Sequence, residues 1–129
     1  MPQGSRIRCQ AILIVDDDAD VREAMVDAVA GPNRRVFAAR EGMEALSLLA
    51  GSEVPRPCLI LLDWLMAPMN GEAFLNRLRE RADFQQLPVV LVSASAHVPG
   101  NEFEPPGVHA TLRKPFELEQ LLGLLNELC

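Results

Sequence analysis

The apolar run Cys58–Asp63 narrows the choice of fold more than any other segment of this chain, and it ends in a carboxylate. Its five consecutive apolar residues are typical of a strand buried on both faces of a parallel sheet, because a half-exposed strand alternates apolar and polar residues. In open α/β sheets, ligands bind outside the carboxyl ends of the strands. Asp63 is therefore the first candidate for chemistry.

Three further apolar runs lead into polar side chains in the same way. Ala11–Val15 precedes Asp16, Asp17 and Asp18, Val89–Val92 precedes Ser93, and a run that ends near Leu112 precedes Arg113 and Lys114. Because parallel strands end at the same edge of a sheet, we expect carboxylates, a hydroxyl and an ammonium to converge there.

Helical patterns separate these runs, and Asp18 is placed to cap the first helix. The alternation of strand and helix predicts βαβ units with helices on both faces of a parallel sheet. In the final helix we expect Leu118, Leu121, Leu122, Leu125 and Leu128 to form the buried stripe, and Leu124 to be exposed. Between Ser93 and Lys114, the segments Pro99–Gly100 and Pro105–Gly107 predict that the fourth helix is short or irregular.

The length of 129 residues indicates one domain, which we expect over residues 9–129 after a flexible polar lead-in over residues 1–8. The net charge of -6 argues against a nucleic-acid surface. Three cysteines without CxxC spacing favour a reducing compartment. No apolar segment approaches the roughly 20 residues of a membrane span, so we expect no membrane contact and a cytoplasmic location.

The neighbouring carboxylates repel each other unless a counter-charge is present. Mg²⁺ binds one or two carboxylates and leaves a position for a phosphoryl oxygen, so we expect Asp17 and Asp63 to bind it directly and Asp16 to bind it directly or through water. Asp63 could then attack phosphorus and form an acyl phosphate, with Ser93 and Lys114 contacting the phosphoryl oxygens. Three acids alone are equally compatible with a solvated cluster that caps a helix.

A set of short motifs in this order resembles the receiver domains of two-component response regulators. The motifs are Ile14–Asp17, Leu62–Asp63, Met66, Met69, Gly71, Ser93–Ala94 and Lys114–Phe116. The resemblance covers the chain from Ile12 to Leu128. It implies a doubly wound α/β domain with a five-stranded parallel sheet in the flavodoxin-like order 2-1-3-4-5.

The resemblance also implies a phosphorylation-controlled signalling switch of a phosphorelay rather than an enzyme with an external substrate. Asp63 would take a phosphoryl group from a sensor histidine kinase or a histidine phosphotransfer domain, in a step that the domain itself catalyses. Ser93 and Lys114 would contact the phosphoryl oxygens, and Mg²⁺ would be held by Asp16, Asp17, Asp63 and the Leu65 carbonyl. The downstream protein and the formation of a homodimer stay open.

The chain departs from the family pattern at three places: Pro68 comes one position late in the loop after the acceptor, Thr111 stands where the family has an aromatic switch residue, and prolines interrupt the fourth helix. The last two departures keep an alternative open, namely a receiver-like interaction module that works without phosphorylation. A magnesium-dependent phosphatase is a weaker rival, because there is no Asp two residues after Asp63 and no room for a cap domain. A flavin carrier would need a Ser/Thr/Gly-rich loop where the three aspartates stand.

Overall fold

A parallel sheet in the order β2-β1-β3-β4-β5 forms the centre of the computed structural model, which describes residues 11–31, 34–51, 59–64, 69–85, 87–93, 108–114 and 116–128. The strands are β1 (Ala11–Val15), β2 (Arg35–Ala39), β3 (Leu59–Asp63), β4 (Val89–Ser93) and β5 (Val108–Arg113). The α-helices of the described residues are α1 (Ala19–Val29), α2 (Gly42–Ala50), α3 (Gly71–Arg79) and α4 (Leu118–Leu128), and a 3-10 turn, η2, covers Ala82–Phe84. This arrangement confirms the predicted doubly wound sheet.

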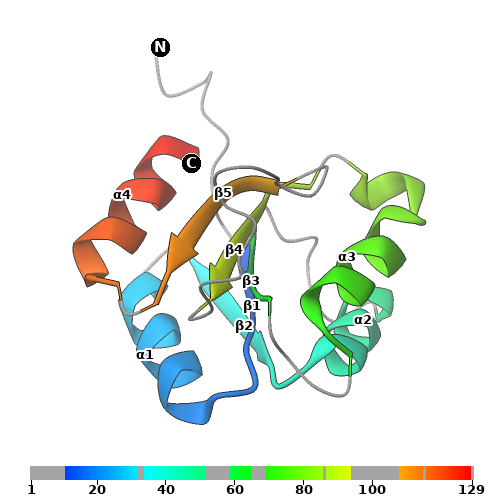
Figure 1. Ribbon diagram of the computed structural model, residues 1–129, viewed down its shortest axis with the longest axis horizontal. Helices are drawn as coiled ribbons and strands as arrows, with labels where there is room; N and C mark the ends of the chain where they lie inside the picture. The colour runs from blue at the N-terminus through cyan, green and yellow to red at the C-terminus, as the bar shows by residue number, and fades with distance from the viewer. Residues whose placement is uncertain are drawn as a thin grey trace.

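Helices cover both faces of the sheet, with α1 and α4 on one side and α2 and α3 on the other (Figure 1). Successive side chains of a strand point to opposite faces, so the central strands contribute to two separate cores. Leu13 and Val15 of β1 belong to the core under α2 and α3, whereas Ile12 and Ile14 belong to the core under α1 and α4. All five residues of both β1 and β3 are buried, which explains why these runs contain no polar residue before their ends.

Side-chain caps set where α1 and α3 begin, the two helices that follow strands β1 and β3 in the chain. Asp18 caps α1, because its Oδ1 accepts hydrogen bonds from the backbone N–H groups of Asp20 and Val21, at 2.9 and 3.2 Å. Asn70 caps α3 by accepting from the Ala73 N–H at 2.8 Å. The predicted capping role of Asp18 is confirmed.

The buried stripe of α4 differs from the prediction. Leu121 and Leu125 are buried as expected, but Leu118 and Leu122 are 52% and 39% exposed, and Leu124 packs against the core under α1 and α4. Leucines occupy a wide arc of this helix, so spacing alone permits more than one buried stripe. Packing against the sheet selects the stripe that includes Leu124 and leaves Leu122 outside.

Several predictions fall on residues outside the described part of the chain. They concern the lead-in over residues 1–8, the start of the central strand at Cys58, and the short or irregular fourth helix between Ser93 and β5. Within the described residues, none of the helices combines the length and the apolar character needed to span a bilayer.

Candidate functional site

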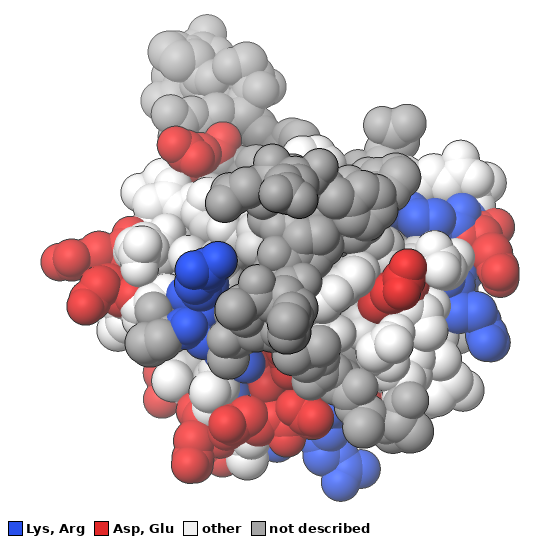
Figure 2. Space-filling view, in the orientation of Figure 1, with Lys and Arg blue, Asp and Glu red and all other residues white. Residues whose placement is uncertain are grey.

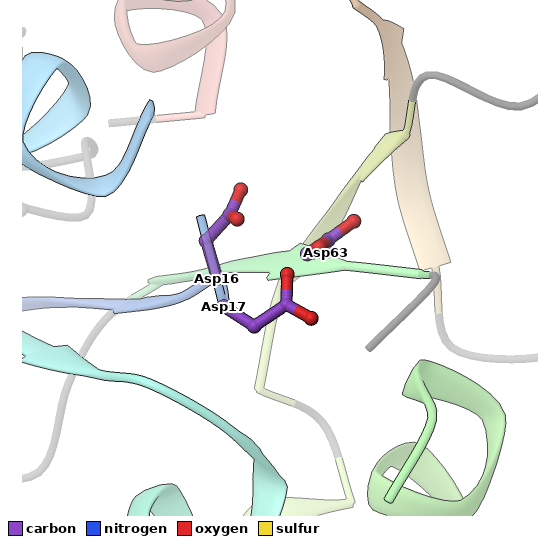
Figure 3. A group of neighbouring side chains, drawn as sticks. All are labelled: Asp16, Asp17 and Asp63. Carbon is purple, nitrogen blue, oxygen red and sulfur yellow. The ribbon is translucent and has the colours of Figure 1, made fainter. Parts of the chain in front are cut away.

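Three carboxylates meet at the carboxyl edge of the sheet (Figure 3). Asp16 and Asp17 directly follow β1, and Asp63 is the last residue of β3, the strand paired with β1. One carboxylate oxygen from each of these residues lies within 4.8 Å of the other two. Asp16 and Asp63 are buried, whereas Asp17 is exposed, so the cluster opens to solvent on the Asp17 side.

Four hydrogen bonds hold Asp16, two at its backbone and two at its side chain. Its N–H donates to the Ala39 carbonyl at 3.1 Å, and its own carbonyl accepts from Arg22 Nη1 at 2.8 Å. Its Oδ1 accepts from the Asp18 N–H at 2.9 Å, and its Oδ2 accepts from Lys114 Nζ at 2.9 Å. The two side-chain bonds compensate the desolvation of a carboxylate that is fully buried.

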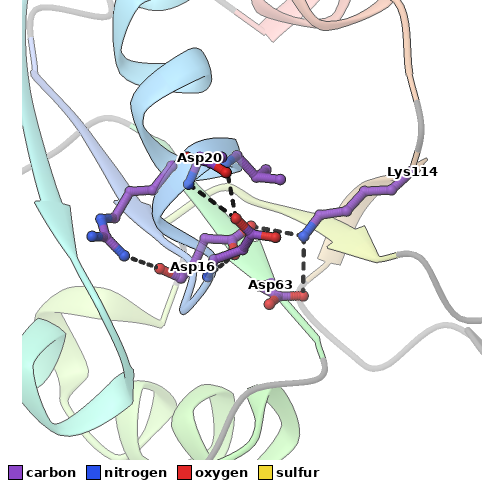
Figure 4. Close-up of polar contacts among 7 residues, drawn as sticks. Asp16, Asp20, Asp63 and Lys114 are labelled. Atoms are coloured by element: carbon purple, nitrogen blue, oxygen red, sulfur yellow. Dashed lines mark hydrogen bonds and ion pairs between the residues drawn. The ribbon is translucent and has the colours of Figure 1, made fainter.

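Lys114 extends from the end of β5 so that its ammonium lies between two of the carboxylates (Figure 4). Its Nζ is 2.9 Å from Asp16 Oδ2 and 3.8 Å from Asp63 Oδ1. The Lys114 side chain is only 15% exposed, so this pairing takes place in a largely desolvated environment. The predicted convergence of Asp16, Asp17, Asp63 and Lys114 is therefore found in the structure.

Ser93 and Leu65, the two other predicted site residues, are described less fully. Ser93 ends β4, between β3 and β5, and it pairs in register with Arg113, the residue before Lys114. Its backbone thus lies at the same edge of the sheet, but its side chain is outside the described part of the structure. Leu65 lies wholly outside the described residues.

The backbone that follows Asp63 approaches the start of α3 closely. The Gly71 N–H donates to the Trp64 carbonyl at 2.9 Å, and the Trp64 N–H donates to the Val92 carbonyl at 3.1 Å. A Cβ atom at Gly71 would lie 2.8 Å from Trp64 Cα and 3.0 Å from the Asp63 carbonyl oxygen. Only glycine allows α3 to begin this close to the residue after the candidate acceptor.

Gly71→Ala is expected to lower the free energy of unfolding by about 1–3 kcal/mol, because the added methyl group must displace backbone rather than a flexible side chain. Chemical denaturation monitored by circular dichroism measures this. The matched control is Gly123→Ala in α4, where the new Cβ has no neighbour within 4 Å. In that variant the free energy of unfolding is expected to rise by about 0.5–1 kcal/mol, because alanine is a better helix former than glycine. Equal effects of the two substitutions would contradict the close approach at Gly71.

The donor set of this site has the chemistry of a hard-cation site. Carboxylate oxygens are the ligands that Mg²⁺ prefers, and Asp16, Asp17 and Asp63 could hold such an ion. Acidic side chains also gather along the lower edge of the molecule, over α1 (Figure 2). In this region Asp17, Asp18, Asp20, Glu23 and Asp27 are all exposed. Their combined field attracts cations toward the open side of the cluster.

The sequence analysis missed Arg22, which reaches back from α1 to the Asp16 carbonyl. A signal was present, because Arg22 is the fourth residue of a helix that begins at Ala19. A cation near a helix N-terminus opposes the helix dipole, so an arginine at this position suggests a local role.

Comparison with solved structures supports the fold. The chemotaxis response regulator CheY4 of Vibrio cholerae superimposes with a TM-score of 0.81 at 25% identity, covering 95% of this chain and 100% of that one. TrrA, a response regulator protein from Thermotoga maritima solved in complex with Mg²⁺-BeF, gives a TM-score of 0.77 at 21% identity, covering 93% of this chain and 99% of that one. At 21% identity, the similarity to TrrA shows a shared fold.

Sequence comparison gives the family. Response regulator MprA of Mycobacterium sp. strain KMS is 35% identical in an alignment 121 residues long, which covers 91% of this chain and 49% of that protein. The chain thus spans about half the length of the curated relatives that it matches. A family model described as the response regulator receiver domain matches residues 12–126. The chain therefore belongs to the response regulator receiver domain family.

Proposed function

We propose that residues 9–129 form a phosphorylation-controlled switch in which Asp63 accepts a phosphoryl group, and that residues 1–8 are a lead-in. The observation that carries this proposal is the position of Lys114 Nζ, 2.9 Å from Asp16 and 3.8 Å from Asp63, beside a cluster of three carboxylates. An ammonium group held between a nucleophilic carboxylate and its acidic neighbours can stabilise the negatively charged oxygens of an incoming phosphoryl group.

The donor is a phosphohistidine on a sensor histidine kinase or a phosphotransfer domain. A carboxylate oxygen of Asp63 attacks phosphorus, a P–O bond forms as the P–N bond breaks, and the released imidazole nitrogen takes up a proton. Asp16, Asp17, Asp63 and the Leu65 carbonyl would hold Mg²⁺. When bound, this ion would offset the negative charge shared by the carboxylates and the phosphoryl oxygens.

The resident side chains position the phosphoryl group. Lys114 exchanges its weak contact with Asp63 for the phosphoryl oxygens, and Ser93, at the end of the neighbouring strand, donates a hydroxyl hydrogen bond. The charge of the phosphoryl group interacts more favourably with one of two conformations of the domain. Phosphorylation therefore shifts the equilibrium toward that conformation, by the difference between the two interaction energies. A downstream protein reads that shift.

Intact mass spectrometry of the wild-type chain tests the proposal. The protein is incubated with acetyl phosphate, and separately with phosphoramidate, whose P–N bond resembles that of phosphohistidine. A gain of roughly 80 Da is expected with Mg²⁺ and not with EDTA, and hydroxylamine should remove it, because it cleaves acyl phosphates. No gain with either donor would instead favour a receiver-like interaction module that works without phosphorylation.

A further inference from the structure

We propose that Arg22 is a positioning residue for the magnesium site, an inference that rests on the proposed function. Its Nη1 donates to the Asp16 backbone carbonyl at 2.8 Å, and its side chain is half-buried. A hydrogen bond from a charged donor is stronger than one from a neutral donor. Arg22 therefore restrains the peptide group that joins the two consecutive acids of the site.

That peptide group decides whether both acids can face Asp63. In a continuing strand, Asp16 and Asp17 would point to opposite faces of the sheet. The strand instead ends at Val15, and the chain turns so that both carboxylates come within 4.8 Å of Asp63. Because a peptide unit is planar, holding the Asp16 carbonyl also fixes the direction of the Asp17 N–H and limits where the Asp17 side chain can lie.

Asp17 depends on this backbone restraint more than Asp16 does. The carboxylate of Asp16 is held directly by the Asp18 N–H and by Lys114. Asp17 is exposed, and within the described part of the chain no hydrogen bond or ion pair of its carboxylate is found. The Asp17 side chain, which lies on the solvent-exposed side of the cluster, is thus oriented mainly through its backbone.

The location of Arg22 supports a specific role. The residue lies on the first turns of α1, where its charge opposes the helix dipole. Its own N–H donates to the Asp18 carbonyl at 2.8 Å, which keeps it in the helix while its side chain bends back toward β1. Loss of the guanidinium should let the peptide group between Asp16 and Asp17 reorient and should weaken cation binding.

The test compares Arg22→Met with Arg34→Met in the full chain. Arg34 is a matched control, because its Nη1 also donates to a backbone carbonyl. That acceptor is the Val29 carbonyl, at 3.0 Å, and Val29 is the last residue of α1, which places it far from the candidate site. The Mg²⁺ dissociation constant is measured by calorimetric titration and by the fluorescence of Trp64. Arg22→Met should raise it by about tenfold, as is typical when a group that orients a metal ligand is removed. Arg34→Met should lower the melting temperature and leave the dissociation constant unchanged.

A second readout needs no metal. The Asp17 N–H belongs to the same peptide group as the Asp16 carbonyl. In amide NMR spectra recorded without Mg²⁺, the chemical shift of the Asp17 N–H should therefore change in Arg22→Met and remain unchanged in Arg34→Met. If Arg22→Met does not fold, Arg22→Gln, whose shorter side chain cannot reach the carbonyl, replaces it in both comparisons.

The outcomes separate this inference from the proposed function. Equal Mg²⁺ affinity in wild type and the Arg22 variant overturns the positioning role and leaves the proposed function intact. An equal loss of affinity in the Arg22 and Arg34 variants also overturns it, because the effect would then be one of general stability. A wild-type chain that binds no Mg²⁺ overturns the proposed magnesium site and, with it, the role of Arg22.

Discussion

Replacing Asp63 with Asn is expected to abolish phosphoryl uptake completely, while the domain stays folded. Asn has nearly the same size and shape as Asp, so it fits the buried end of β3, but its amide cannot attack phosphorus to form an acyl phosphate. Intact mass spectrometry after incubation with acetyl phosphate and Mg²⁺ should show no gain in this variant. Circular dichroism checks that the fold is retained.

Asp27→Asn is the control for this substitution. Asp27 is an exposed acid on α1, outside the carboxylate cluster, so the variant loses the same charge without touching the site. It should take up the phosphoryl group as the wild type does. If Asp63→Asn still gains a phosphoryl group, the acceptor is another side chain and the assignment of Asp63 is wrong.

Lys114→Met is expected to lower the free energy of unfolding by about 3 kcal/mol when no divalent cation is present. The substitution keeps a long apolar side chain but removes the ammonium that lies 2.9 Å from the fully buried Asp16 carboxylate. Two carboxylates are then left close together in a desolvated environment. Urea denaturation measures the loss, and added Mg²⁺ should restore part of it, since the cation replaces the missing positive charge.

Two further variants test the cause of this loss. Arg40→Met breaks the Arg40–Glu44 pair, whose side chains are 76% and 40% exposed, and should cost less than about 1 kcal/mol. Adding Asp16→Asn to Lys114→Met removes the uncompensated charge and should recover stability. A Lys114→Met variant that loses no more than Arg40→Met would show that the buried pair does not stabilise the domain.

Local patterns in the sequence were sufficient to predict a parallel sheet covered by helices on both faces and most of the candidate site, whereas the strand order was implied by the resemblance to receiver domains. Continuous apolar runs identified the buried strands, because a parallel sheet covered on both faces excludes polar side chains until each strand ends. The same rule predicted that the residues after those ends share one edge. Asp16, Asp17, Asp63 and Lys114 do meet there, although Lys114 and Asp16 are 98 positions apart in the chain.

The prediction for α4 was wrong at Leu118, Leu122 and Leu124, for a physical reason that sequence spacing cannot remove. Leu122 and Leu124 are equally apolar, and each lies at helical spacing from other leucines of α4. The rotation of the helix about its own axis depends on the surface against which it packs, and that surface is built from strands distant in sequence.

By itself, then, the sequence determined the order of the elements and which chemical groups reach the edge of the sheet, since both depend on local periodicity and on strand ends. Only the tertiary structure decided how those groups are held. The partnership of Lys114 with Asp16, the closeness of Gly71 to Trp64 and the bond from Arg22 to the Asp16 carbonyl depend on distances between separate elements. Such distances follow from packing and backbone direction, which no local pattern in the chain encodes.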